Sequence, residues 1–263
     1  MSRMRRLTEF WHHRDLFRTW TQREFQVRYK QAVLGAAWAI VQPLAFTIVY
    51  SVIFTQIIPV SSPDVPYPVF VYTAMLPWTY LSGALTFGVS SVVSNLSLVT
   101  KIYFPREILP LAAVAVSFFD MLLGFVVYVG LLAVFAVPMH VVVLWVPVLI
   151  LFQTLLVVGL VLGASALNVF RRDIRFVVPL FLQLWLYASP VIYSMDLPMP
   201  NWLRWVLVLN PMTGYIESFR AVLLYGRSPD PALLLPAVIV SLAISLVGLS
   251  TFVKLEPYFA DVI

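Results

Sequence analysis

The chain has 263 residues, of which 61% are hydrophobic and only 11% are charged, and its mean hydropathy is +0.92. A soluble globular protein carries about 25% charged residues, so this composition excludes a water-exposed globule, a disordered chain and a collagen-like chain. The net charge is +5, from 17 basic and 12 acidic residues, and the sequence contains no cysteine. A disulfide, a thiolate metal site and a cysteine nucleophile are therefore excluded as well.

The N-terminal arm, residues 1–32, holds eight Lys or Arg residues before the first apolar stretch. It lacks the short apolar core and cleavage site of a signal peptide, so we expect it to remain in the mature protein. From Asp15, a plausible N-cap, the pattern predicts an amphipathic helix lying in the membrane interface, with a solvated basic arm as the alternative. Phe25 and Tyr29 lie off the apolar arc of this helix. The arc itself consists of Leu16, Phe17, Trp20 and Val27.

Six apolar stretches follow the arm. Each has about twenty residues or more, which is enough for an α-helix to cross about 30 Å of hydrocarbon. The sequence therefore predicts an all-α polytopic membrane protein with six transmembrane helices, in which residues 33–263 form one transmembrane domain. The expected spans are residues 33–58, 69–93, 108–137, 141–167, 176–193 and 232–253.

The distribution of basic residues indicates how these spans are oriented. An even number of spans places both termini on one side of the membrane, and cytoplasmic segments carry the excess of Lys and Arg. Fourteen of the 17 basic residues lie in the arm, in the segments after spans two and four, and in the tail. The other three, Arg204, Arg220 and Arg227, lie in the connection between spans five and six. Both termini are therefore predicted to be cytoplasmic.

The connection between spans five and six, residues 194–231, is unusually apolar for a loop. A residue before proline disfavours the helical conformation, so the pattern predicts two short helices that enter the outer leaflet and return, broken at Asn210-Pro211. Glu217 and Arg220, three residues apart, are expected to pair on one helix face. A pair of interfacial helices exposed to water is the alternative. The connection also contains Trp202, Trp205 and a final Gly226.

The sequence offers little for catalysis. No GxxxxGK[ST] phosphate loop is present, so nucleotide hydrolysis would have to come from another chain. His12 and His13 lie in the arm and His140 lies in a short outer turn, too far apart for one site, and neither a catalytic residue nor a metal site is predicted. Asp120, near the middle of span three, is expected to be protonated and hydrogen-bonded to a neighbouring helix, with a role in substrate passage as the alternative.

Aromatic residues make up 15% of the chain and form two ridges. Residues at every fourth position trace one slowly rotating ridge along a helix. Aromatic faces with a few hydrogen-bonding groups suit a sugar chain, because its C–H faces stack and its hydroxyls need partners, although packing or lipid-facing aromatics give the same pattern. The first ridge is Trp38, Gln42, Phe46, Tyr50 and Phe54; the second is Phe181, Trp185, Ser189 and Tyr193, with Gln183 and Tyr187 nearby.

Four motifs carry a family resemblance. They are RYKQAVLG from Arg28 with the following Trp38 and QPL, KIYFPRE from Lys101, NVFRRDI from Asn168, and SPVIY from Ser189 with the later Asn210-Pro211. In this order and spacing they resemble the permease subunits of the type 2 ABC exporters for O-antigen polysaccharide and teichoic acid, over nearly the whole chain.

The resemblance implies an assembly and a substrate. It implies a homodimer of six-span subunits that combines with two copies of a separate ATPase chain, which binds ATP and Mg²⁺, so that this chain needs no cofactor. It also implies export of a polyprenyl-pyrophosphate-linked polysaccharide across the bacterial plasma membrane. A type 2 ABC permease for drugs or lipids, or a noncatalytic membrane scaffold, is the alternative.

The resemblance further assigns roles to segments. Residues 95–107 match the cytoplasmic coupling helix that docks in a groove of the ATPase, and residues 194–226 match the paired outer helices that gate the exit. Anchoring by the positive-inside rule is the alternative explanation for Lys101, Arg106, Arg171 and Arg172. A pyrophosphate that arrives from the cytoplasm needs cations at the inner interface, and Arg28 and Lys30 are the candidates. The coupling residues are expected to be Lys101, Ile102, Tyr103, Phe104, Pro105, Arg106, Glu107, Arg171, Arg172 and Asp173, and the outer-gate residues Trp202, Trp205, Asn210, Pro211, Glu217 and Arg220.

Overall fold

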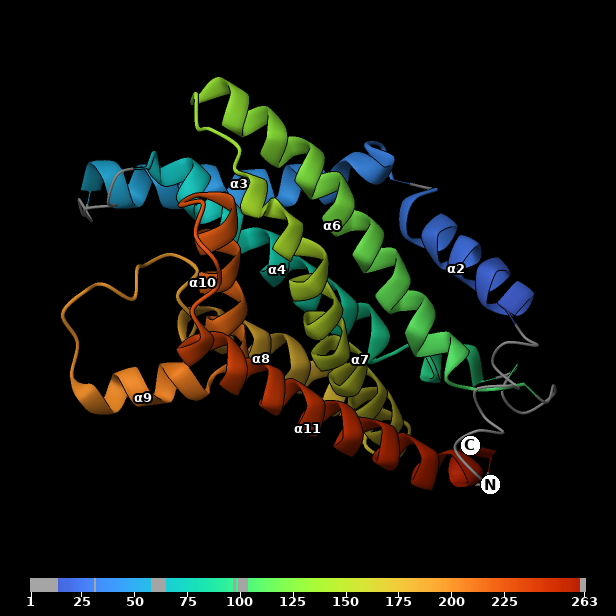
Figure 1. Cartoon of the computed structure of the whole chain (residues 1–263). Helices are drawn as coiled ribbons and strands as arrows, with labels where there is room; N and C mark the ends of the chain where they lie inside the picture. The colour runs from blue at the N-terminus through green and yellow to red at the C-terminus, as the bar shows by residue number, and fades with distance from the viewer. Residues whose placement is uncertain (1–13, 31, 58–64, 97, 99–103, 261–263) are drawn as a thin grey trace.

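The computed structural model describes residues 14–30, 32–57, 65–96, 98 and 104–260, and every regular element in these ranges is helical (Figure 1). The all-α prediction is confirmed for these residues. The longer helices are α2 (Arg14–Tyr29), α3 (Trp38–Val52), α4 (Tyr67–Gly88), α6 (Ile108–Val134), α7 (Val146–Phe170), α8 (Ile174–Tyr187), α9 (Asn201–Leu209), α10 (Pro211–Leu223) and α11 (Pro231–Leu255). Short helical turns are η1 (Gly35–Ala37), η2 (Ile53–Ile57), η3 (Val93–Asn95), η4 (Val141–Trp145) and η5 (Glu256–Ala260).

Four helical segments in the described part of the chain are long and apolar enough to cross a membrane. They are Gly35–Ile57, Ile108–Val134, Val141–Phe170 and Pro231–Phe259, which correspond to predicted spans one, three, four and six. Predicted span two is α4, which has 22 residues but is rich in Tyr, Trp, Thr and Pro. Predicted span five is α8, which is apolar but has only 14 residues.

Helix α8 ends at Tyr187, six residues before the predicted end of span five at Tyr193. Ala188 is the C-cap of the helix, and the chain then turns through Ser189 and Pro190. A residue before proline disfavours the helical conformation, which accounts for the early end. The apolar run continues through this turn, so hydropathy alone overestimated the length of the helix.

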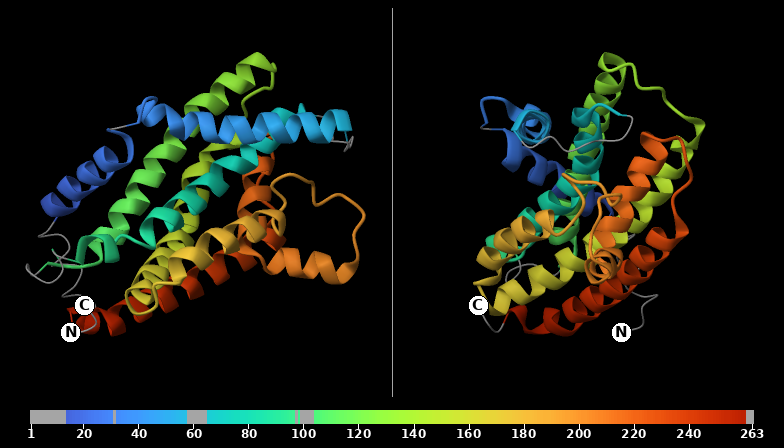
Figure 2. Two further views of the ribbon diagram at one scale, coloured as in Figure 1. Left: turned by 180° about the vertical axis from the view of Figure 1, so that it is seen from behind. Right: turned by 90° about the vertical axis from the view of Figure 1, so that its left-hand side faces the viewer.

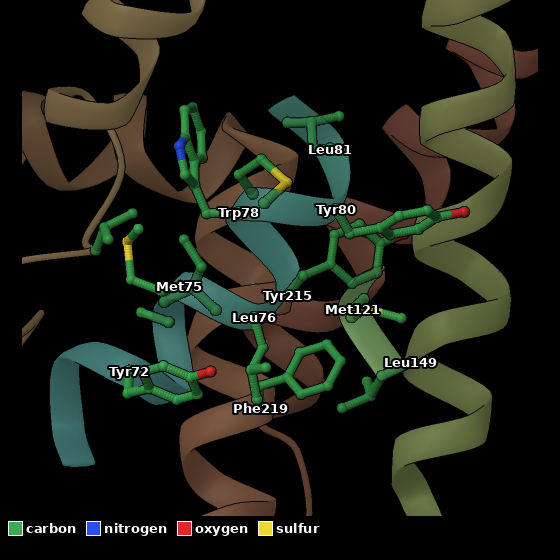
Figure 3. Close-up of a cluster of buried hydrophobic side chains, with 14 of the residues drawn as sticks. Tyr72, Met75, Leu76, Trp78, Tyr80, Leu81, Met121, Leu149, Tyr215 and Phe219 are labelled. Carbon is green, nitrogen blue, oxygen red and sulfur yellow. The ribbon is translucent and has the colours of Figure 1, made fainter. Parts of the chain in front are cut away.

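The main hydrophobic core surrounds α4. A helix that is apolar on all sides is a buried one, and nearly every residue from Tyr67 to Leu81 is buried. Side chains of α4 interdigitate with Met121 of α6, Leu149 of α7, and Tyr215 and Phe219 of α10 (Figure 3). This central position makes α4 the element against which the other helices are arranged.

Helices α7 and α11 pack closely side by side. A Cβ atom added at Gly159 would lie 2.5 Å from the Cα atom of Ser245, closer than real atoms approach. Gly248 faces Gly159 across the same contact. Two glycines therefore allow the backbones of these helices to touch, as small residues do between membrane helices.

One end of the molecule gathers the ends of five helices. The start of α2, the end of α4, the start of α6 and the ends of α7 and α11 lie together there, while α9 and α10 lie toward the opposite end (Figure 2). A second, smaller core lies at this end and combines residues from α2, α6, α7, α11 and η5. Its buried members include Trp20, Phe104, Ile108, Phe252 and Phe259.

Helix α2 is present as predicted, and its buried face matches the predicted arc only in part: Trp20 is buried, and Leu16 and Phe17 pack against the smaller core. Val27 was expected on the apolar arc, yet it is 71% exposed. Tyr29 is buried instead, and the ring of Phe25 lies 4.9 Å from the Tyr29 ring and 5.4 Å from that of Phe119 on α6. The reason is that α2 packs against α6 of its own chain, so the neighbouring helix and not a flat interface selects which side chains are buried.

Candidate transport cavity and coupling surface

A cavity of about 620 Å³ lies between α2, α3, α4, α6 and α8. The first predicted ridge forms one wall, because Trp38, Gln42, Phe46 and Tyr50 all line it. The opposite walls bring aromatic rings, amides and hydroxyls together, which is the lining that the sequence predicted for a sugar track. They include Trp78, Thr79, Ser82, Thr86, Phe87, Gln183 and Tyr187.

Phe54, the last member of the first ridge, lies outside this lining. It belongs to the π-helical turn η2, and its ring centroid lies 6.0 Å from that of Tyr67. A π-helical turn has more residues per turn than an α-helix, so fourth-residue spacing no longer keeps side chains on one face. The ridge therefore reaches from Trp38 to Tyr50.

The second predicted ridge is not confirmed as a wall of the cavity. Trp185 points toward α4, where its ring is edge-on to that of Trp78, with 6.1 Å between the ring centroids. The Phe181 and Trp185 ring centroids are 5.1 Å apart. Ser189 and Tyr193 lie beyond the end of α8, so they share no helical ridge with Trp185. The helix presents a different side to the cavity, through Pro179, Leu182, Gln183, Leu186 and Tyr187.

A buried ion pair lies at the α2 end of the cavity. The Arg28 Nη1 atom is 2.7 Å from Asp120 Oδ2, and the Tyr29 hydroxyl donates to Asp120 Oδ1 at 2.7 Å. Burial, together with the nearby carboxylate, raises the pKa of the Tyr29 phenol above its ordinary value, so the phenol stays protonated and donates. Asp120 is hydrogen-bonded to a neighbouring helix as predicted, through Arg28 and Tyr29 of α2.

Sequence reasoning missed this pair because it looked for a partner only within the spans. Arg28 lies on α2, outside them, and reaches the middle of α6 because the two helices run alongside each other. The arginine had been singled out only as a cation for an incoming pyrophosphate. Lys30, the other cation proposed for that role, is exposed and is not part of the cavity lining.

Asn210 organises the opposite end of α8. It caps α10, since its Oδ1 atom accepts from the backbone N–H of Met212 at 3.0 Å, and the same atom accepts from Trp185 Nε1 at 2.9 Å. Its Nδ2 atom donates to the Ala188 carbonyl at 3.0 Å and to Ser189 Oγ at 2.9 Å. The predicted break at Asn210-Pro211 is confirmed, because α9 ends at Leu209 and α10 begins at Pro211.

Arg220, on α10, also holds the turn that follows α8. Its Nη1 atom lies 2.7 Å from Glu217 Oε1, so the predicted pairing is confirmed. The guanidinium is buried and also donates to the carbonyls of Val191 at 2.8 Å and Tyr193 at 3.2 Å. The turn after α8 is therefore held from two sides, by Asn210 and by Arg220. Trp202 and Trp205 on α9, by contrast, are both more than two-thirds exposed.

Of the predicted coupling segment, residues 95–107, the structure describes 95, 96, 98 and 104–107, and Lys101, Ile102 and Tyr103 lie outside the described residues. Phe104 is buried in the smaller core, and Arg106 donates to the backbone carbonyl of Glu256 at the end of α11. Pro105 and Glu107 are half-buried just before α6 begins. The second half of this segment is thus bound to the end of α11 and is not a free loop.

The second predicted coupling contact is open to solvent. Arg171, Arg172 and Asp173 are all exposed in the short turn between α7 and α8. Asn168 fixes this turn, because its Nδ2 atom donates to the Val89 carbonyl at 3.0 Å and its Oδ1 atom accepts from the Arg175 N–H at 3.2 Å. The described residues 104–107 of the first coupling segment and this turn lie at the same end of the molecule (Figures 1 and 2).

The family of ABC-2 type transporters matches residues 15–224, which is most of the chain. The chain belongs to the ABC-2 type transporter family. The O-antigen export system permease protein RfbA of Myxococcus xanthus is 30% identical over 264 residues, covering 98% of this chain and 99% of the relative. A protein of the same name from Klebsiella pneumoniae is 29% identical over 250 residues, covering 95% of each chain. The polysialic acid transport protein KpsM of Escherichia coli is 23% identical over 215 residues, covering 78% and 79%.

The part of the chain that matches the ABC-2 transporter family contains the cavity and both predicted coupling segments. It begins in α2 and ends just after α10, so the Arg28–Asp120 pair and the turn held by Asn210 lie within it. The resemblance predicted from the four motifs is confirmed. Among the residues that the structure describes, no three His, Asp or Glu side chains gather as metal ligands.

Proposed function

We propose that this chain is the membrane subunit of an ATP-driven exporter that moves a polyprenyl-pyrophosphate-linked polysaccharide across the bacterial plasma membrane. The cavity carries the proposal, because aromatic rings and hydrogen-bonding groups alternate on its walls. Rings such as those of Trp38 and Trp78 stack on the C–H faces of a sugar, while Gln42, Thr79 and Gln183 are suited to its hydroxyls. Relatives named for O-antigen export support an O-antigen type of polysaccharide over teichoic acid.

The proposed assembly is a homodimer with two copies of a separate ATPase. The proposed topology has six spans, with α4 and α8 added to the four long apolar helices, and both termini are cytoplasmic. Helix α4 supports this by its length of 22 residues, whereas α8, with 14, would cross only together with the turn that follows it. Helices α9 and α10 are then the paired outer helices that enter the outer leaflet and gate the exit.

The proposed coupling uses the end of the molecule that carries both coupling segments. Closure of the ATPase would push on residues 95–107 and on the turn at Arg171 and Arg172. Phe104 and Arg106 attach the first segment to α6 and α11, so a push there would be transmitted to two long helices at once. Helix α6 carries Asp120 at the cavity, which links this movement to the proposed substrate path.

The experiment that tests this proposal separates insertion from export. We would replace Lys101, Ile102 and Tyr103 by Gly and Ser in cells that depend on this chain for surface polysaccharide. The replacement stops at Tyr103 because Phe104 is part of the smaller core. The variant should insert normally and lose polysaccharide export, and normal export would contradict the coupling assignment.

A second measurement tests the sugar track. Trp38→Ala together with Tyr50→Ala should slow export of long polysaccharides more than it weakens binding of the ATPase, because the two rings line the cavity and not the coupling end. Phe181→Ala is the matched control, since this ring lies on α8 outside the cavity lining. Unchanged export by the double variant would contradict the sugar track.

A further inference from the structure

Arg28 is a buried cation that the protein satisfies only in part. Its side chain is 92% buried, and its one pairing nitrogen, Nη1, donates to Asp120 Oδ2 at 2.7 Å and to Ser117 Oγ at 3.3 Å. The Nε and Nη2 atoms are buried and have no hydrogen-bond partner within the described structure. A buried donor without a partner costs about 1–3 kcal/mol, and more for a charged group, so this arrangement needs an explanation.

The unpartnered atoms lie beside the cavity. Arg28, Phe87 and Asp120 all line it, and the guanidinium carbon of Arg28 lies 3.8 Å from the centroid of the Phe87 ring. The ring covers the guanidinium, while Phe87 itself is 44% exposed. Rotation of this one side chain would therefore uncover two N–H groups of a cation toward the cavity.

We infer that Asp120 is a built-in competitor for an anion site at Arg28, and that a phosphate-bearing group in the cavity displaces it and loosens α2 from α6. This deepens the proposed function and rests on it, because it states how the anionic end of a substrate is sensed. A guanidinium binds phosphate oxygens through two parallel N–H bonds, and Nε and Nη2 form such a pair. Asp120 makes only a single bond to Arg28, through Nη1, whereas a phosphate on Nε and Nη2 makes two. The two anions then share one guanidinium and repel each other, so the phosphate competes with the carboxylate.

The exchange keeps a hydrogen-bond partner on both residues, although Asp120 Oδ2 and Arg28 Nη1 lose the bond between them. After displacement Asp120 keeps the hydrogen bond from the Tyr29 hydroxyl, and Arg28 exchanges one anion for another. The ion pair is one of the polar contacts that join the end of α2 to the middle of α6. Its loss would weaken that attachment, and the helix that precedes the first span would then move.

The test measures the separation of α2 from α6 in the complete transporter. The chain has no cysteine, so spin labels can be placed at Val27→Cys on α2 and Val126→Cys on α6, both of which are more than two-thirds exposed. The transporter, with its ATPase subunit, is reconstituted in phosphatidylcholine vesicles. Added inorganic pyrophosphate should produce a saturable second population at longer distance.

Three variants separate an anion site from a purely structural pair. Asp120→Asn removes the competitor, so the apparent Kd for pyrophosphate should fall by about tenfold if Asp120 occupies Arg28 about 90% of the time. Arg28→Gln should abolish the response. Arg28→Gln combined with Asp120→Asn keeps a neutral hydrogen-bonding pair; α2 should stay docked in this double variant, and pyrophosphate should have no effect.

The outcomes decide the inference independently of the proposed function. No response to pyrophosphate in the parent and no tighter binding by Asp120→Asn would overturn the inference, even if polysaccharide export in cells is normal. A response that persists in the neutral double variant would also overturn it. Vesicles of phosphatidylglycerol distinguish the source of the phosphate, because a long-distance population without pyrophosphate there would identify the membrane lipid as the displacing group.

Discussion

Asn210 joins three segments through one side chain. Its amide contacts Trp185 on α8, Ala188 and Ser189 in the turn, and the first turn of α10, so both of its polar atoms make two hydrogen bonds. An asparagine amide has two donors and one carbonyl acceptor with two lone pairs, and all of these are used here. The Tyr187 end of the cavity wall formed by α8 depends on this residue.

Replacement of Asn210 by Ala is expected to destabilise the protein by about 2–3 kcal/mol, because the Trp185 indole and the α10 N-terminus lose their partners at once. The measurement is the thermal unfolding midpoint in detergent. Asn201→Ala is the matched control, since Asn201 is exposed at the start of α9, and it should change the stability by less than about 0.5 kcal/mol. Equal effects of the two changes would contradict the role of Asn210.

Arg220 illustrates the cost of breaking a buried ion pair. Arg220→Met leaves Glu217 without its cation and two carbonyls of the turn without a donor. A loss of about 3–5 kcal/mol is expected, whereas the double change with Glu217→Gln should recover part of it. Arg204→Met on exposed α9 is the control and should be close to neutral. Chemical unfolding in mixed micelles measures the stability of the parent, the two Arg220→Met variants and the control. An Arg220→Met protein as stable as the control would refute this prediction.

The contact between α7 and α11 shows how one missing side chain positions a whole element. Gly159 lies against Ser245 with no room for a Cβ atom. Gly130 on α6, by contrast, has open space where its Cβ atom would lie. The two glycines are both within helices, so they differ in packing and not in backbone conformation. They form a matched pair for measuring the value of this contact.

Gly159→Ala is expected to lower stability by about 1–3 kcal/mol, because the added methyl group forces α7 and α11 apart. Gly130→Ala should be neutral or stabilising by up to about 1 kcal/mol, since alanine favours a helix more than glycine does. The difference in thermal midpoint between the two variants checks the prediction. A Gly159→Ala protein as stable as Gly130→Ala would show that the helices separate at no cost.

The elements also show where sequence reasoning succeeds. The break at Asn210-Pro211 was predicted because it depends on local chemistry, the restriction that proline imposes on the residue before it. The end of α8 was missed because the apolar run continues into a turn held by distant residues, Asn210 and Arg220. The buried face of α2 was assigned only in part for a similar reason, since it is selected by α6. Local signals predicted the helices, but their ends and neighbours depend on tertiary contacts.

The same limit applies to the candidate site. Four-residue spacing found the α3 wall of the cavity, because that wall is one regular helix. It could not find Arg28 and Asp120 as a pair, since 92 positions separate them in the sequence. It also assigned Trp185 to the cavity, although its indole is used to bind Asn210. A side chain's role followed from spacing only where the helix that carries it is regular and faces the cavity.

At the scale of the whole molecule, several basic residues lie at the end where five helices begin or end. The turn with Arg171 and Arg172 and the segment around Arg106 lie at the end where α2 starts and α11 finishes (Figure 2). Arg204 lies on α9 and Arg227 lies in the connection between α10 and α11, toward the other end. Arg106 donates to the Glu256 carbonyl, whereas Arg171 and Arg172 are exposed, and in the proposed assembly they face the ATPase.

Arg171→Ala combined with Arg172→Ala should therefore weaken the proposed contact with the ATPase without disturbing insertion. Twelve of the fourteen basic residues that set the orientation remain, so the positive-inside bias persists. The matched control is Arg204→Ala combined with Arg227→Ala, which removes the same charge from exposed positions elsewhere. Copurification of the ATPase should fall for the first pair alone, and the difference from the parent should be smaller at higher salt, because screening already weakens the contact that the parent's exposed arginines make. If both pairs behave alike, net charge rather than this turn governs association with the ATPase, and the coupling role of the α7–α8 turn is lost.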